Sequence, residues 1–383
     1  MKMNRLLFFL SIVLALLSCR DDDYVIPSQK DLVSKPDTIG VAKLYVLNEG
    51  NMGSNKASID YFEFETGVYH RNIYPEVNPT VVKELGDVGN DIKIYGSKLY
   101  AVINCSHKVE VMDVNTARRI GQIDIENCRY ITFHEGKAYV SSYAGPVVLD
   151  PKAPLGKVLE IDTATLRITR DVVVGYQPEE MVILRNKLYV ANSGGYRFPD
   201  YDRTVSVINL TTLKEEKKID VGINLHRIKA DSRGDIYVSS RGDYYDVPAN
   251  LYVIDSEKDE VKQTLNIPVT NMCVIGDSIY LYSTEFSYNT GNTTIGYGIL
   301  NTKTKKLDSK NFITDGTEKG IKMPYGIAVN PFTRDIYVTD ARNYVSTGYV
   351  YCFSRDGKLK WKTEGGNIPA HFAFVYETQN STK

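Results

Sequence analysis

The sequence predicts an all-β fold, a seven-bladed β-propeller built from four-stranded antiparallel blades. Three observations lead to this prediction. A short apolar stretch containing tyrosine recurs seven times along the chain. The segments around it alternate polar and apolar residues, and none has a convincing helical period. Finally, the C-terminus carries an apolar strand that the first repeat lacks, which would close a ring.

The repeats are marked by their central tyrosines, which recur at intervals of 39 to 57 residues, the spacing of a propeller or solenoid array. The marker residues are Tyr45, Tyr100, Tyr139, Tyr189, Tyr237, Tyr280 and Tyr337. We expect each of them in the second strand of its blade, in a structural role.

The fourth repeat shows the pattern of one blade. Apolar strands are expected at residues 180–184 and 188–191, a third strand at 204–210 and a more polar outer strand at 215–221. Four antiparallel strands that grade from apolar to charged describe a propeller blade. In the seventh repeat, residues 324–331 and 335–340 closely resemble the YVTN-type propeller repeat.

Closure of the ring follows from the two ends of the repeat region. The first repeat begins directly with its second strand, at residues 43–47, and residues 368–375 supply an apolar strand at the other end. Pairing these two segments would complete blade one and leave no strand edge open. The alternative is an open solenoid, which needs polar caps at its ends, and the sequence shows none.

The N-terminus is predicted to be a lipoprotein signal peptide, at residues 1–18. Lys2 and Arg5 precede an apolar run over residues 6–17, which is too short to span a bilayer. The run ends in Leu-Ser-Cys, so Cys19 matches the lipidated cysteine of a bacterial lipobox. A plain secretory signal with a chance cysteine is the alternative. Residues 19–40 are then the lipidated N-terminus and a flexible tether, and residues 41–383 the propeller.

The four residues after Cys19 indicate the destination. Arg20, Asp21, Asp22 and Asp23 resemble the acidic export signal of lipoproteins in Bacteroidota. This resemblance implies an outer-membrane, lipid-anchored protein that faces the cell exterior. The alternative is an ordinary solvated acidic linker.

Composition narrows the function classes. The 383 residues include 46 Lys and Arg against 47 Asp and Glu, a formal charge of −1, which argues against a nucleic-acid binder. The chain has 28 Tyr against 12 Phe and 1 Trp, and tyrosine favours strands and amphipathic contact surfaces. Five His and five Cys leave little material for a metal-rich enzyme.

The variable loops are expected on one face of the ring, together with the connections between blades. Binding residues concentrate on such loops, and exposed aromatic side chains beside amides and arginines suit a large, flat, amphipathic ligand. The alternative for any one tyrosine is packing of its loop. The predicted ligand-binding residues are Asn90, Arg129, Tyr130, Tyr143, Tyr176, Tyr196, Phe198, Tyr201, His226, Arg227, Tyr244, Tyr245, Asn271, Phe286, Tyr288, Tyr325, Tyr344 and His371.

No catalytic motif is recognisable, so we expect a protein that is not an enzyme. His107, His226 and His371 fall on the loop-rich face, where they would either ligate a metal or make unrelated hydrogen bonds, and we expect the second. Asp200, Asp202, Asp243 and Asp246 are a weak calcium signal, because acidic turns are common. No catalytic or metal-binding residue is therefore predicted.

The cysteines permit one disulfide. Cys105 and Cys128 both fall on the loop face, and an extracytoplasmic location would allow them to pair, although the sequence does not give the geometry. Cys273 and Cys352 lie in apolar strands and are expected in the core.

The most distinctive segment runs from residue 44 to residue 62 and reads LYVLNEGNMGSNKASIDYF. With the lipobox, the acidic export signal and the YVTN-like repeats, it resembles the BtuG-type surface lipoproteins of Bacteroidota over essentially the whole chain. The resemblance implies tight binding of cobalamin (vitamin B12) or a related corrinoid, no required cofactor, and transfer to a BtuB-type TonB-dependent outer-membrane transporter. The alternatives are a surface propeller that binds a glycan or peptide and a metal-dependent propeller hydrolase or lactonase.

Overall fold

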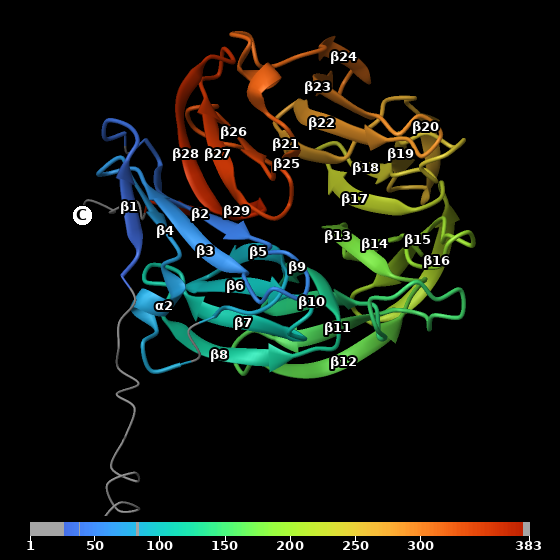
Figure 1. The fold of residues 1–383 in the computed structure, drawn as a ribbon. Coiled ribbons are helices and arrows are strands. Elements are labelled where there is room, and N and C mark those ends of the chain that lie inside the picture. Colours follow the sequence, from blue (N-terminus) through green and yellow to red (C-terminus); the bar gives the residue numbers. More distant parts are fainter. Residues whose placement is uncertain (1–26, 38, 82–83, 378–383) are drawn as a thin grey trace, which may run out of the picture.

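The protein folds into a closed ring of antiparallel sheets (Figure 1). Two cavities lined by the inner strands and their connections form a channel at its centre. The structure, a computed structural model, describes residues 27–37, 39–81 and 84–377. The predicted signal peptide, Cys19 and the export signal from Arg20 to Asp23 lie outside these residues. None of the helices that the described residues form is long and apolar enough to span a membrane.

Seven sheets make seven blades, as the sequence predicts. Blade 1 consists of β29 (Pro369–Tyr376), β2 (Val41–Asn48), β3 (Ser58–Glu63), β4 (Val68–Arg71) and β1 (Gln29–Leu32). Blade 2 consists of β5 (Gly89–Tyr95), β6 (Lys98–Ile103), β7 (Lys108–Asp113) and β8 (Arg119–Asp124). Blade 3 consists of β9 (Cys128–His134), β10 (Lys137–Ser142), β11 (Lys157–Asp162) and β12 (Arg167–Val173).

The remaining four blades continue the same order from the channel outward. Blade 4 consists of β13 (Pro178–Leu184), β14 (Lys187–Asn192), β15 (Thr204–Asn209) and β16 (Lys214–Asp220). Blade 5 consists of β17 (Leu225–Ala230), β18 (Asp235–Ser240), β19 (Asn250–Asp255) and β20 (Glu260–Thr264). Blade 6 consists of β21 (Asn271–Ile275), β22 (Ser278–Phe286), β23 (Thr293–Asn301) and β24 (Lys306–Ser309). Blade 7 consists of β25 (Pro324–Val329), β26 (Ile336–Asp340), β27 (Thr347–Phe353) and β28 (Leu359–Asn367).

Helical structure in the described residues is limited to two single turns. They are α2 (Tyr74–Val77) and the 3₁₀ turn η1 (Thr317–Gly320), each in a connection between blades. The four strands predicted for the fourth repeat are confirmed as β13 to β16, each within about two residues of its expected limits.

Ring closure is confirmed. The C-terminal strand β29 pairs with β2 in antiparallel register, so that Val46 lies opposite Phe372. On its two sides β29 packs against the inner strands of blades 2 and 7, β5 and β25. The chain therefore supplies the innermost strand of blade 1 from its C-terminal end, and the two ends of the propeller hold each other in place.

Part of the predicted tether is wrong. Residues 29–32 form β1, which pairs with β4 as a fifth, outermost strand of blade 1. The unpaired outer edge of β4 accounts for this, because a strand edge offers free backbone donors and acceptors to any extended segment nearby. The outermost strand of a blade is mostly polar, as this segment is, so its hydrophobic pattern gives no sign of a strand.

The core is divided among the contacts between blades. The buried apolar side chains fall into seven clusters, and each cluster joins two neighbouring blades. The marker tyrosines lie in these layers: six of them are buried, and Tyr280 is half-buried. Three of their hydroxyl groups reach the next blade, because Tyr45 donates to the Val114 carbonyl, Tyr189 to Asp259 and Tyr237 to the Thr302 carbonyl. The structural role predicted for these residues is confirmed.

The two faces of the ring differ in loop length. The loops between second and third strands and the connections between blades share one face, which we call the loop face. Its longest second-to-third-strand loops span residues 143–156 and 193–203. The opposite face, which we call the turn face, carries the short turns between first and second strands. The loop face is therefore the one with material for a binding site.

We predict that the ring depends on β29. A chain that ends at residue 367 should lose cooperative thermal unfolding and aggregate, because β2 becomes an open edge and two inter-blade layers lose their partners. Size-exclusion chromatography and a circular dichroism melt test this. A chain that ends at residue 377 is the control and should unfold like the full protein. Equal melting temperatures for the two truncated chains would contradict the prediction.

Candidate functional site

The site is built where the inner strands begin, at the loop face. In six of the seven blades the inner strand carries one extra residue there, a β-bulge, and only β21 of blade 6 pairs with its neighbour without a shift in register. A bulge turns consecutive side chains toward the same side of a strand. As a result, both members of a consecutive pair, such as Glu179 and Glu180 or His226 and Arg227, lie at the centre of the ring.

Hydroxyl groups on the second strands hold some of these bulges. Ser141 Oγ accepts a hydrogen bond from the Tyr130 N–H and donates to the Glu179 carbonyl in the next blade. Thr339 Oγ1 accepts from the Gly326 N–H and donates to the Pro369 carbonyl in blade 1. Each hydroxyl therefore accepts a hydrogen bond from a backbone N–H in a bulge, and it joins two blades near the loop face.

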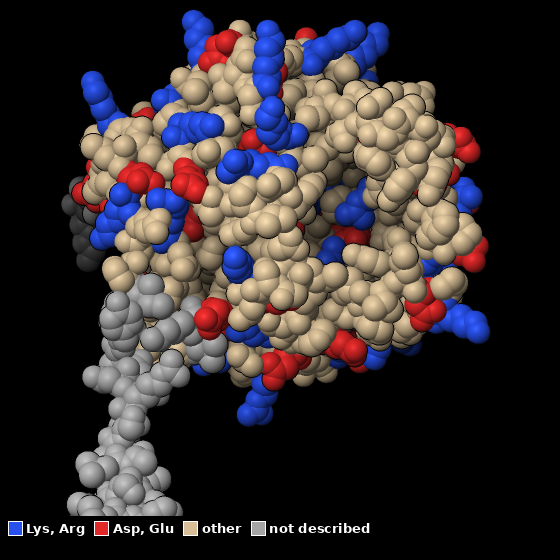
Figure 2. Space-filling model, in the orientation of Figure 1, with Lys and Arg blue, Asp and Glu red and all other residues tan. Residues whose placement is uncertain are grey.

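A cavity of about 450 Å³ opens at the centre of the loop face, and we call it the loop-face cavity. Figure 2 shows the hollow at the centre of the ring, with basic and acidic side chains inside it. All seven blades contribute to its lining, with arginine, tyrosine, asparagine and histidine side chains among the residues. The polar and aromatic lining residues are Glu49, Asn51, Asn90, Asn104, Arg129, Tyr130, Tyr196, His226, Arg227, Arg241, Thr270, Tyr282, Tyr325 and Tyr344.

One wall of the cavity is an ion-pair cluster around Glu179. Its carboxylate accepts hydrogen bonds from Arg129 Nε and Nη2 at 3.3 and 3.0 Å and from the Tyr143 hydroxyl at 2.7 Å. Arg241 Nη1 lies 3.6 Å from the same carboxylate. Burial raises the pKa of Glu179, but the two guanidinium groups outweigh this effect and hold the pKa below its usual range. The cluster has one more positive than negative charge.

The floor of the cavity consists of Tyr130, His226 and Arg227. The Tyr130 hydroxyl and His226 Nε2 are hydrogen-bonded at 3.1 Å, and the Arg227 guanidinium lies 5.2 Å from the centre of the Tyr130 ring. Burial and the nearby Arg241 and Arg227 lower the pKa of His226 well below 6.5. The imidazole is therefore neutral at pH 7 and serves as a hydrogen-bonding group.

The opposite wall is formed by Glu49 and tyrosines. Glu49 accepts a hydrogen bond from the Tyr325 hydroxyl at 2.8 Å and lies 3.0 Å from His371 Nε2. The Tyr325 ring makes an edge contact with Tyr344, whose backbone carbonyl accepts a hydrogen bond from Asn51. Gly326 is required beside Tyr325, because a Cβ there would lie 2.3 Å from the Ala370 carbonyl oxygen. The wall thus depends on the closing strand β29.

A patch of aromatic side chains flanks the cavity over blades 4 to 6, and we call it the aromatic patch. It consists of Phe198, Tyr201, Tyr244, Tyr245, Phe286 and Tyr288. The rings contact one another, and those of Tyr245 and Tyr288 are stacked with centroids 4.9 Å apart. All except Tyr201 are exposed, up to 59% for Tyr288. The rings pack on each other and also present an aromatic surface.

The structure brings eight of the predicted ligand-binding residues together in the lining of the loop-face cavity: Asn90, Arg129, Tyr130, Tyr196, His226, Arg227, Tyr325 and Tyr344. Six others form the aromatic patch. Tyr143 is buried behind the cavity, and Tyr176 lies under the guanidinium of Arg197, 3.7 Å from its ring centre. Asn271 and His371 face the channel on its other side.

Sequence reasoning missed Glu49, Glu179, Arg241 and Tyr282. Glu179 directly follows Pro178 at the start of an inner strand, and Arg241 directly follows the last residue of β18. The sequence did carry a signal for both residues: a charged side chain near the start of an inner strand, and another directly after a second strand.

Side chains that carried the weak metal signals are engaged in hydrogen bonds within the protein. The Asp202 and Asp243 carboxylates accept hydrogen bonds from backbone N–H groups of their own loops, those of Arg203 and Val247. His107 Nδ1 accepts one from the Asn127 N–H. These three residues therefore organise loops on the loop face.

The disulfide that the sequence permits between Cys105 and Cys128 is not formed in the structure, where both residues are free thiols. Cys128 is buried, and its Sγ lies 3.3 Å from the Lys108 carbonyl oxygen of its neighbouring blade. Burial raises the pKa of this thiol to about 12. Cys352 is buried as expected, whereas Cys273 is half-buried and lines the channel.

Comparison with known proteins identifies the family. The family model described as "Domain of unknown function (DUF5074)" matches residues 43–374, so the chain belongs to this family. A search of curated proteins found no match.

Among solved structures, a quinonprotein alcohol dehydrogenase-like protein from Bacteroides thetaiotaomicron has a TM-score of 0.60 at 16% identity and covers 88% of this chain and 79% of its own. Hydrazine synthase of Kuenenia stuttgartiensis has a TM-score of 0.56 at 15% identity, covering 70% and 77%. The computationally designed protein Ika8 has a TM-score of 0.52 at 11% identity, covering 91% and 95%. At these identities the likeness concerns the fold alone.

We predict that Glu179→Gln destabilises the protein by about 3–5 kcal/mol, because it leaves the half-buried guanidinium groups of Arg129 and Arg241 without their counter-charge. Urea denaturation followed by circular dichroism measures the change. Glu216→Gln, on the exposed outer strand of the same blade, is the matched control and should cost less than about 0.5 kcal/mol. Equal midpoints for the two variants would contradict this role for Glu179.

We predict a loss of stability between pH 7 and pH 5 that depends on His226. In the unfolded chain this histidine takes up a proton near pH 6.5, whereas in the folded protein its lowered pKa keeps it neutral. Acidification therefore favours the unfolded state. His226→Asn should reduce the slope of the free energy of unfolding against pH, and Tyr130→Phe, which keeps the buried imidazole, should retain it. An unchanged slope in His226→Asn would refute the assignment.

Proposed function

We propose that this member of the DUF5074 family is a binding protein without catalytic activity that captures a corrinoid, such as cobalamin, at the loop-face cavity. The observation that carries the proposal is the lining of that cavity, in which guanidinium, amide and phenol groups surround one opening beside an exposed aromatic patch. The resemblance to BtuG-type lipoproteins over the propeller repeats supports the same ligand.

The polar groups of the cavity match the rim of a corrinoid. A corrinoid is a broad disk that carries amide groups around its edge, and amides both donate and accept hydrogen bonds. Asn90, Arg129 and Arg241 supply donors, and Tyr196 and Tyr344 supply hydroxyl groups that do both. A disk of this breadth would lie across the mouth of the cavity, with only its lower substituents inside.

The aromatic patch suits the apolar parts of the same ligand. Tyr244 and Tyr245 line a groove of about 330 Å³ that begins at Arg241, a residue that also lines the loop-face cavity. A ligand wider than the cavity would extend onto these rings, and the aromatic faces would be covered by its methylated surface. The cavity and the patch therefore form one continuous binding surface.

The rigidity of the ring favours tight binding. Glu179, Tyr130 and Glu49 are each fixed by hydrogen bonds within the protein. Little conformational entropy is then lost when a ligand binds to groups already in place. A preformed site is what a scavenger of a scarce nutrient needs.

We propose that the protein acts at the outer membrane, anchored through lipid on Cys19 and facing the cell exterior. In this position it would pass its ligand to a BtuB-type TonB-dependent transporter. Support comes from the lipobox and from residues Arg20 to Asp23 in the sequence, together with the resemblance to BtuG-type lipoproteins. The loop face would have to remain open toward the transporter.

Titration calorimetry of the chain from residue 20 with cyanocobalamin tests the proposal. We predict a one-to-one complex with a Kd well below micromolar, and at least tenfold weaker binding for Tyr344→Ala, which removes a ring at the rim of the cavity. Phe332→Ala is the matched control, because Phe332 is an exposed aromatic residue of the same blade on the turn face, and it should bind like the wild type. Micromolar or absent binding by the wild-type chain would overturn the proposed function.

A further inference from the structure

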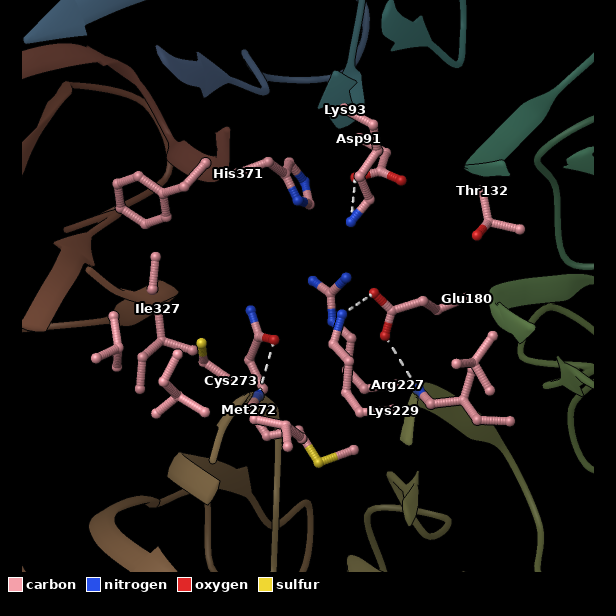
Figure 3. A pocket seen from close by; sticks show the side chains of 18 of the residues that line it. Asp91, Lys93, Thr132, Glu180, Arg227, Lys229, Met272, Cys273, Ile327 and His371 are labelled. Carbon is pink, nitrogen blue, oxygen red and sulfur yellow. Dashed lines mark hydrogen bonds and ion pairs between the residues drawn. The ribbon is translucent and has the colours of Figure 1, made fainter. Parts of the chain in front are cut away.

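A second cavity, of about 470 Å³, occupies the channel on the side of the turn face, and we call it the channel cavity. The inner strands of all seven blades line it. Figure 3 shows its side chains converging on the middle of the ring. Corrinoid capture at the loop face makes no use of this cavity, so a ligand could occupy it whether or not the protein binds a corrinoid.

The channel cavity has two chemically different halves. Strands β5, β13 and β17 supply a charged half, which holds Asp91, Lys93, Glu180, Arg227 and Lys229. Strands β21, β25 and β29 supply a second half, which we call the apolar half because methionine, isoleucine, valine and phenylalanine side chains dominate it, beside Asn271 and His371. The halves face each other across the cavity, so a molecule inside it would touch both.

The two carboxylates of the charged half already have partners. Asp91 accepts hydrogen bonds from the N–H groups of Ile92 and Ile131 and lies 3.7 Å from Lys93 Nζ. Glu180 accepts hydrogen bonds from the Ile228 N–H and from Lys229 Nζ. Burial raises the pKa of Glu180, but Lys229 and Arg227 outweigh it and bring the pKa to about 2. Each carboxylate is thus matched by one lysine.

Arg227 is the cation left over. Its side chain is buried, with the whole residue 7% exposed, and its Nε has no hydrogen-bond partner among the described residues. Nor does it take part in any ion pair that these residues form, although its guanidinium lies over the Tyr130 ring. In Figure 3 it reaches toward the middle of the cavity, where it faces His371. A buried guanidinium group without an ion-pair partner of its own is costly, so an anion supplied from outside would be strongly favoured.

We propose that the channel cavity is a second binding site, which takes a small molecule with one carboxylate group on a compact apolar body. The carboxylate pairs with the Arg227 guanidinium, whose planar pair of N–H groups matches it in a bidentate contact. The apolar body lies against the opposite half, formed by residues such as Met272, Ile327 and Phe372.

The charge balance and the volume select this class of ligand. Three cations face two carboxylates, so the excess is one positive charge, which a single carboxylate neutralises and a doubly charged phosphate would exceed. A cavity of this size lies within the range of small-molecule sites. The apolar half disfavours a fully polar anion, because such an anion would place charged oxygens against apolar side chains.

Calorimetric titration of the chain from residue 20 with 2-naphthoate tests the site, with 2-naphthamide as the uncharged ligand of the same shape. We expect 2-naphthoate to bind at least tenfold more tightly than 2-naphthamide, and Arg227→Gln to abolish the difference. Equal binding of the two ligands to the wild-type chain would overturn the proposal, and so would tight binding of 2-naphthoate by Arg227→Gln.

A second pair of variants leaves Arg227 in place. Thr132 is half-buried on β9 and lines the channel cavity but not the loop-face cavity. Thr132→Glu adds a carboxylate beside the site and should weaken 2-naphthoate binding at least tenfold, whereas Thr132→Gln, of the same size, should bind within about threefold of the wild type. Equal effects of the two substitutions would overturn the proposal. So would a tenfold loss of 2-naphthoate binding in Tyr344→Ala, because it would move the ligand to the loop-face cavity.

Discussion

The packing of each blade against its two neighbours is the interaction on which the rest of this structure depends. The buried apolar side chains of the described residues form layers between blades, one at each of the seven contacts, rather than a separate core within each blade. Such layers are complete only in a closed ring. The pairing of β29 with β2 closes the ring and also completes the layers on both sides of blade 1.

Closure has a direct consequence for the site. The inner strands meet around one axis, and a bulge near the start of six of them places two consecutive side chains at that axis. The channel is therefore lined with more charged groups than alternating strands would supply. Buried charges need partners, and most of them have one: Glu179 has Arg129, and Glu180 has Lys229. These pairs connect different blades, so the ring and its charges stabilise each other.

Within the described part of the chain, Arg227 is the one side chain that lines both the loop-face cavity and the channel cavity. It separates two chemically different spaces: one polar, aromatic and open toward the long loops, the other half charged and half apolar. Its position at the centre of the ring gives the channel a cation whose Nε has no hydrogen-bond partner among the described residues. The axis itself is therefore a functional candidate beside the loop face.

Much of the fold could be predicted from the sequence, because each of its signals is local or repeated. The spacing of Tyr45, Tyr189 and the other marker tyrosines determined the number of blades, and the apolar segment at residues 368–375 determined how the ring closes. The strand β1 and the contacts of Cys128 were not predictable from the sequence. The first depends on the free edge of β4, and the second on the Lys108 carbonyl beside the Cys128 sulfur, and only the folded chain brings these groups together.

Positions in the loops and connections likewise determined most of the residues at the loop face, although Asn271 and His371 face the channel on its other side. Only the tertiary structure decided that Tyr130, His226 and Arg227 meet in one cavity while Tyr176 and Phe198 do not. For the residues of the inner strands the physical reason is the bulges. A single extra residue changes which side chains point to the axis, and it is set by hydrogen bonds between strands and blades that no local pattern records. Tyr176 and Phe198 lie in connections outside the inner strands, where contacts with neighbouring side chains decide their positions.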